Sequence, residues 1–131
     1  MAMVVKQISV FLENEAGHFL ELSRVIGGAG VNITALSLAE TADYGIARMI
    51  VDDVDQGVRA LHEAGYSVNL TDVLRVEVPD GPGALARILA SFAESGVNVS
   101  YIYGYSSGGT AFLIIKAGDP QKAAELLKPR V

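Results

Sequence analysis

Apolar and polar residues alternate over short segments at two related places in the chain. Val76 and Val78 are separated by Glu77 and preceded by Arg75, a spacing typical of a strand with one buried face. The same spacing is found nearer the N-terminus at Ile8, Val10 and Leu12. Apolar residues then recur at helical spacing after both segments, at Phe19, Leu22 and Ile26 and at Leu85, Ile88, Leu89 and Phe92. The pattern predicts a strand followed by an amphipathic helix, twice over.

Each helix is followed by segments typical of two further strands and a second helix. Gly30 and Gly96 stand where the end of a helix favours a residue with positive φ. We expect the second strands at residues 31–38 and 97–105, and the third strands at 46–51 and 110–116, joined as hairpins. Asp55 and Asp119 precede apolar residues at helical spacing, so we expect them to cap the second helices. Residues 66–71 predict a fourth strand in the first half.

The two halves of the chain are related by an offset of 66 residues. This offset aligns Gly30-Val31-Asn32-Ile33 with Gly96-Val97-Asn98-Val99. In the third strands the alignment is expected to shift to 64, which places Gly45 and Met49 opposite Gly109 and Leu113. The repeat predicts an α+β protein of two tandem ferredoxin-like βαββαβ units, residues 1–71 and 72–131. The sheets would be mixed and mostly antiparallel with helices on one face, and the second unit would lack its last strand.

Composition narrows the classes of function. The chain has no cysteine and only two histidines, His18 and His62, so we expect no metal site and no cofactor. A formal net charge of −5 argues against binding to nucleic acid or to an anionic membrane surface. We find no targeting segment and no long apolar run, and expect a cytoplasmic protein.

The turns between the first strand and the first helix of each half are the strongest candidates for chemistry. Their sequences are Asn14-Glu15-Ala16-Gly17 and Asp80-Gly81-Pro82-Gly83. A helix that begins after such a turn offers backbone N–H groups that have no intrahelical partner, and these groups can bind a carboxylate. Asn, Asp, Pro and Gly also form ordinary turns without any ligand, so the residue types alone leave both readings open.

Asn14-Glu15-Ala16-Gly17-His18-Phe19 and Asp80-Gly81-Pro82-Gly83-Ala84-Leu85, each followed by Gly-Val-Asn-Ile/Val, resemble the turn of ACT domains. The segment Glu40-Thr41-Ala42-Asp43-Tyr44-Gly45-Ile46 is similar to that of free-standing tandem ACT proteins that carry no enzyme. The resemblance covers nearly the whole chain. It implies a non-catalytic regulatory protein that binds a small ligand, usually an amino acid, between two ACT units, and that forms a homodimer.

The resemblance also implies which residues contact the ligand. Asn14 and Asp80 would meet its amino or polar groups, and backbone amides near Gly17-His18 and Gly83-Ala84 would bind its carboxylate. Asn32 and Asn98 would donate hydrogen bonds from the neighbouring unit. The whole set is Asn14, Glu15, Ala16, Gly17, His18, Phe19, Asn32, Ile33, Asp80, Gly81, Pro82, Gly83, Ala84, Leu85, Asn98 and Val99.

Three questions stay open at this point. Glu15, Ala16 and Gly81 depart from the commonest family pattern, so the first unit binds differently from the second or not at all. The chain could instead be an assembly module whose turns bind nothing, or a small enzyme that holds an anion with Arg24 or Arg48. Tyr101, Tyr103 and Tyr105 alternate along one strand, where they would pack against another surface or line a ligand site. The identity of the amino acid and the downstream partner cannot be read from the residues.

Overall fold

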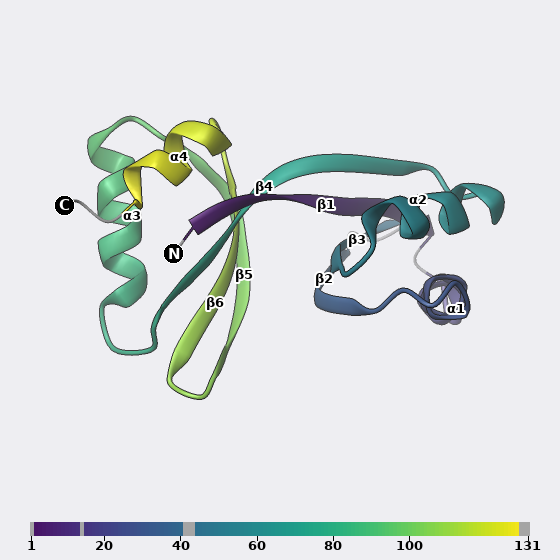
Figure 1. The fold of residues 1–131 in the computed structure, drawn as a ribbon. Helices are drawn as coiled ribbons and strands as arrows, with labels where there is room; N and C mark the ends of the chain where they lie inside the picture. Colours follow the sequence, from purple (N-terminus) through teal and green to yellow (C-terminus); the bar gives the residue numbers. More distant parts are fainter. Residues whose placement is uncertain (1, 14, 41–43, 129–131) are drawn as a thin grey trace. The chain divides into compact units, whose positions relative to one another are not determined.

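The computed structural model describes residues 2–13, 15–40 and 44–128, which form six strands and four helices (Figure 1). In chain order the elements are β1 (Ala2–Glu13), α1 (His18–Gly28), β2 (Ile33–Glu40), β3 (Tyr44–Val51), α2 (Val54–Glu63), β4 (Val68–Pro79), α3 (Ala84–Glu94), β5 (Val99–Ser107), β6 (Thr110–Ala117) and α4 (Pro120–Leu126). This order contains βαββαβ from β1 to β4 and βαββα from β4 to α4, and the α+β prediction with two ferredoxin-like units is confirmed.

The chain divides into two units. One unit, called the first unit below, is Lys6–Thr71, and the second unit combines Asp72–Val131 with Met1–Val5. The strand order is β2-β3-β1-β4 in the first unit and β5-β6-β4-β1 in the second. The pairs β1–β3, β2–β3, β4–β6 and β5–β6 are antiparallel. Strands β1 and β4 therefore each contribute to both units.

This sharing of strands corrects one expectation. The second unit was expected to lack its last strand, but the start of β1 stands in that place. Ala2 and Val4 pack against the hydrophobic core of the second unit. A single strand of 12 residues is long enough to pair in both sheets. The division also differs from the expected domain limits, because residues 1–5 group with the second unit instead of the first.

The core of the first unit lies between one face of its sheet and the helices α1 and α2. The buried residues are Ile8, Val10, Leu12, Leu22, Ile26, Val31, Ala47, Met49, Val51 and Leu61. They include the alternating positions of the first strand and the apolar stripe of the first helix, as the pattern predicts. Burial of such side chains, at about 25 cal/mol per Å² of apolar surface, is the main force that stabilises the unit.

The core of the second unit is built in the same way from β4, β6, α3 and α4, and Figure 1 shows both helices on one side of the strands. Its buried residues are Leu74, Val76, Ile88, Phe92, Val97, Ile115, Ala117 and Ala123. Leu85 departs from the predicted stripe, since 43% of its surface is exposed. This leucine is the second residue of α3, directly after the turn Asp80-Gly81-Pro82-Gly83.

The offset of 66 residues holds through every strand pair. Leu12 pairs with Gly45 and Val78 with Ala111, so Ala111 is the counterpart of Gly45. The expected shift to 64 is therefore wrong, and the two hairpins do not differ in length. The cap expected at Asp55 is also wrong. Asp53 caps α2 by accepting a hydrogen bond from the Gln56 N–H, as Asp119 caps α4.

Two further features bear on the predictions. Gly30 and Gly96 adopt positive φ, 77° and 71°, after α1 and α3, as expected for residues that end a helix. Among the described residues no helix is both long and apolar enough to cross a membrane.

Candidate functional site

The two turns have the same backbone conformation. Gly17 and Gly83 precede α1 and α3 with φ of 89° and 85°, in the left-handed region that side chains other than glycine rarely adopt. Among the residues that the structure describes, no side chain caps either helix start. In α3 the Ala84 N–H bonds to the Gly81 carbonyl and the Arg87 N–H to the Gly83 carbonyl. The N–H groups of Leu85 and Ala86 lie between them, where a helix provides no carbonyl to accept their hydrogen bonds.

A pocket of about 440 Å³ opens beside the second turn, within the range of about 300–1,000 Å³ found for small-molecule sites. Four residues predicted for the site line it, namely Asp80, Gly81, Ala84 and Leu85. The other lining residues are Val78, Ile102, Tyr103, Gly104, Tyr105, Ser106, Ala111 and Leu113. Most of this wall is apolar, and Asp80 is the one carboxylate among the lining residues.

Arg87 adds a positive charge at the same turn. A Cβ placed on Gly83 would lie 3.4 Å from Arg87 Nη1, so the guanidinium lies close to Gly83, although Arg87 is not among the residues that line the pocket. Sequence reasoning misses this residue, because it is one turn into the helix and outside the motif. The only sign is its i+4 spacing from Gly83, which brings a helical side chain back over the helix start. The turn thus combines an anion, a cation and free N–H groups.

Gly104 of β5 is one of the residues that line the pocket. A Cβ on this residue would overlap the Phe112 carbonyl oxygen and lie 2.9 Å from Leu113 Cδ2, so strands β5 and β6 approach closely here. On the opposite face of these strands the Tyr105 and Phe112 rings stack with centroids 5.0 Å apart. Arg75 lies over the Phe112 ring and pairs with Glu77 at 3.0 Å. The ring of Tyr105 therefore packs against Phe112 within its own sheet. Tyr103 and Tyr105 are nevertheless also among the residues that line the pocket.

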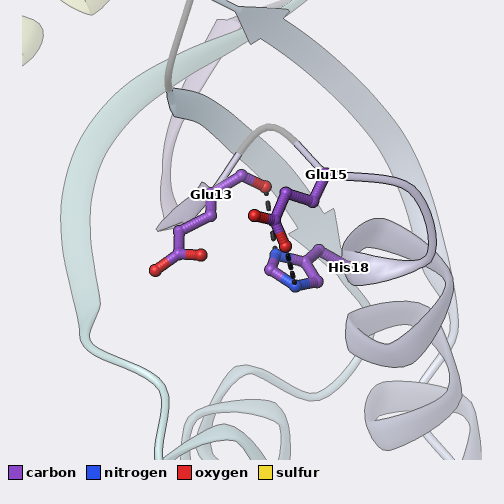
Figure 2. Close-up of side chains that lie close together, drawn as sticks. All are labelled: Glu13, Glu15 and His18. Carbon is purple, nitrogen blue, oxygen red and sulfur yellow. Dashed lines mark hydrogen bonds and ion pairs between the residues drawn. The ribbon is translucent and has the colours of Figure 1, made fainter.

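The first turn carries a different set of side chains. Figure 2 shows the His18 ring beside Glu13 and Glu15, with Nδ1 3.1 Å from the Glu13 carbonyl oxygen and Nε2 3.5 Å from Glu15 Oε2. One ligand-type atom from each of the three residues lies within 4.8 Å of the other two. Both ring nitrogens of His18 are occupied by these contacts, and the two glutamates are exposed. We interpret the cluster as a hydrogen-bonded pair at the surface, of a kind that is common without a metal ion.

The remaining predicted residues are distributed as follows. Asn14 lies outside the described residues, as do positions 41–43 of the segment that resembles free-standing tandem ACT proteins. Ala16 and Pro82 are exposed in their turns. Phe19, Ile33 and Val99 pack against the cores of their own units.

Asn32 and Asn98 are exposed at the end of the sheet away from the turn of their own unit. Ile33 pairs with Val51, and Glu13 pairs with Tyr44 at the other end of β3. Seven residues of strand separate these ends, or roughly 23 Å. Each asparagine is tied to its own hairpin, since the Asn32 N–H donates to Asp52 and the Asn98 carbonyl accepts from the Gly118 N–H. One unit alone does not bring an asparagine and a turn together.

The two arginines considered for an enzyme do not converge. Arg24 is exposed on α1, which covers one face of the first sheet. Arg48 lies between the core residues Ala47 and Met49 on β3, so its side chain points to the other face. No anion site forms between them.

Comparison with known proteins gives a consistent result. A family model described as an ACT domain pair matches residues 3–130. Protein BT0572 from Bacteroides thetaiotaomicron is similar in structure, with a TM-score of 0.92 and 40% sequence identity over 96% of this chain and 88% of that one. The ligand-free regulatory subunit of aspartate kinase from Thermus thermophilus has a TM-score of 0.67 at 15% identity, over 95% of this chain and 93% of that one. At this identity the likeness concerns the fold alone.

One curated relative also matches part of the chain. The acetolactate synthase small subunit of Aquifex aeolicus (strain VF5) is 34% identical over 79 residues, which cover 53% of this chain and 41% of that protein. The match thus spans less than half the length of this relative.

Proposed function

The chain belongs to the family of ACT domain pairs, and on that premise we propose that it is a regulatory protein that binds an amino acid and has no catalytic activity of its own. The pocket beside the second turn is the observation that carries this proposal. Its apolar wall suits a side chain, and Asp80 and the N–H groups at the start of α3 lie where the turn meets the helix. A free amino acid is divided in the same way, because its ammonium and carboxylate groups lie at one end and its side chain at the other.

The charges at the turn match those of a zwitterion. The Asp80 carboxylate is placed to accept hydrogen bonds from an ammonium group, and the N–H groups at the start of α3 are placed to donate to a carboxylate. Hydrogen bonds to charged groups contribute about 1.5–3 kcal/mol each in favourable geometry. Several of these bonds are enough for binding in the micromolar to millimolar range.

The asparagines complete the site only if a neighbouring unit supplies them. Asn32 and Asn98 lie at the opposite end of the sheet from the turn of their own unit, so a neighbouring unit must bring one of them to the ligand. A homodimer provides such a neighbour. The ligand would then favour one arrangement of the units, and a partner protein would respond to that arrangement. A cytoplasmic location and the lack of a cofactor stay predictions from the sequence.

The names of two relatives suggest what kind of partner is regulated. One is named as the small subunit of a synthase and the other as the regulatory subunit of a kinase. We propose by analogy that this chain acts on a separate catalytic protein. The alternative of an assembly module without a ligand is less well supported, because it leaves the pocket and the charges of the second turn without a role.

Thermal unfolding in the presence of each of the twenty amino acids tests the proposal. A ligand at 100 times its dissociation constant stabilises the folded protein by about 2.7 kcal/mol. We expect a rise in unfolding temperature with one or a few amino acids, and a smaller rise in the Asn98→Ala variant. If none of the twenty raises the unfolding temperature at millimolar concentration, the assembly module is the better account.

A further inference from the structure

The two units differ at the turns where a ligand would bind. The constant offset of 66 residues allows the two sites to be compared position by position. Pocket positions Gly81, Ala84 and Gly104 of the second unit correspond to Glu15, His18 and Leu38 of the first. Each of these three exchanges gives the first unit a larger side chain, whereas Ala111 and Leu113 correspond to the smaller Gly45 and Ala47.

Contacts and strand register place these larger side chains. His18 contacts both the Glu13 carbonyl oxygen and the Glu15 carboxylate (Figure 2). Leu38 faces the same side of its strand as Gly104, because it pairs with Ala47 as Gly104 pairs with Leu113. At these three positions the first turn is therefore bordered by bulkier side chains than the second.

The charges around the turns also favour binding of a carboxylate at the second turn over the first. The first turn is surrounded by Glu13, Glu15 and Glu21, whose counterparts in the second unit are Pro79, Gly81 and Arg87. Glu21 lies in the first turn of α1, where a ligand carboxylate would have to bind. A carboxylate approaching this turn meets three like charges, whereas at the second turn it meets the Arg87 guanidinium beside Gly83.

We infer that each chain holds one amino-acid site, at the Asp80–Gly83 turn of the second unit, and that the first turn is closed to free amino acids. This inference rests on the proposed function and assigns its site. Arg87 binds the ligand carboxylate together with the start of α3, and Asp80 binds the ammonium group. The side chain of the ligand lies against Val78, Ile102 and Leu113, so the site takes amino acids with an apolar side chain.

Isothermal titration calorimetry on the full chain tests the inference. The probes are L-valine, L-leucine, L-isoleucine and L-phenylalanine, with L-aspartate and L-lysine as charged comparisons. We expect binding of at least one apolar amino acid at one molecule per chain, and at least tenfold weaker binding of the charged pair, because the apolar wall offers them no counter-charge.

Two matched variants locate the site. Arg87→Gln should weaken binding about tenfold, since it removes a charged donor from the turn. Glu21→Gln changes the corresponding position of the first unit, and binding should stay within twofold of the original. Both positions are exposed on helices, and an unchanged unfolding temperature without ligand shows that each variant is folded.

The outcomes separate the inference from the proposed function. Two molecules per chain, or an effect of Glu21→Gln without one of Arg87→Gln, would overturn the single site and leave amino-acid binding intact. Tight binding of aspartate or lysine alone would overturn the apolar preference. If none of the twenty amino acids gives a binding isotherm, the proposed function fails and this inference fails with it.

Discussion

Gly104 provides the most direct test of how closely the strands approach beside the pocket. In Gly104→Ala the new Cβ would overlap the Phe112 carbonyl oxygen, and would lie 2.9 Å from Leu113 Cδ2 and 3.2 Å from Leu113 Cα. Two of these three atoms belong to the backbone of β6, so relief requires the strands to separate. The counterpart Leu38 in the first unit shows that the restriction is local to the second sheet and not a property of the fold.

The size of the effect follows from two opposing terms. Overpacking of a well-packed site costs about 1–3 kcal/mol, and contact with backbone favours the upper part of this range. Replacing glycine with alanine also restricts the unfolded chain, which offsets the cost by about 0.4–1 kcal/mol. We expect a net loss of about 2 kcal/mol, or about 8 °C in unfolding temperature for a chain of this size.

Thermal unfolding followed by circular dichroism measures this loss, with Gly27→Ala as the matched control. A Cβ on Gly27 would have no atom within 4 Å, and the residue lies in α1 without positive φ. The control should be as stable as the original protein or more stable by about 0.5–1 kcal/mol, because alanine favours the helix. A Gly104→Ala variant within about 0.5 kcal/mol of the original protein would refute the close approach of β5 and β6.

Three further predictions concern stability. Asp53→Ala should cost about 1 kcal/mol in urea unfolding, because the Gln56 N–H loses its cap, whereas Asp55→Ala should cost less than about 0.3 kcal/mol; equal losses would contradict the assignment of the cap. Removal of residues 1–5 should lower stability by about 2 kcal/mol, since Ala2 and Val4 leave the second core, and an unchanged unfolding temperature would argue against the shared strand. Burial, with a smaller effect of Glu21, raises the pKa of Tyr66 above 10.0. Between the pKa of the unfolded state and that of the folded state, the folded protein therefore retains the Tyr66 proton while the unfolded chain has lost it. The stability that Tyr66 contributes is complete below pH 10 and declines as the pH rises through the folded pKa. Tyr66→Phe should lack this decline when unfolding is measured between pH 9 and 11.

Much of the fold follows from local pattern. The alternation at Val76 and Val78 and the helical stripe through Ile88 and Phe92 place strands and helices correctly, because these side chains need a buried face wherever they occur. The offset of 66 residues identifies the repeat from residue identities alone. The errors arise where the structure depends on contacts between residues that are far apart in the sequence.

Two such features have no signal in the local sequence, namely the register of the third strands and the origin of the last strand of the second unit. The shift to 64 matched Gly45 with Gly109, but strand pairing aligns Gly45 with Ala111, because hydrogen-bond register and not residue identity sets the correspondence. The missing strand of the second unit comes from the opposite end of the chain. A contact between residues 2–5 and a unit that begins at Asp72 leaves no trace in local periodicity.

The candidate site is predicted in part. The motif identifies Asp80, Gly81, Ala84 and Leu85, which line the pocket. It does not identify Arg87, whose position depends on the path of a side chain along the helix. The contrast between the two units is not predicted either. Glu15 and His18 are ordinary residues for a turn, and only the fold shows which side chains lie around the same site.

A titration followed by ¹H–¹⁵N correlation spectra tests the central claim most directly. The protein is titrated with the apolar amino acid that raises its unfolding temperature most. We predict that the amide signals of Leu85 and Ala86 shift on binding, since their N–H groups donate to the ligand carboxylate at the start of α3. The amide signals of Phe19 and Leu20, the corresponding residues of the first unit, should not move. Shifts at Phe19 and Leu20 without shifts at Leu85 and Ala86 would contradict the account.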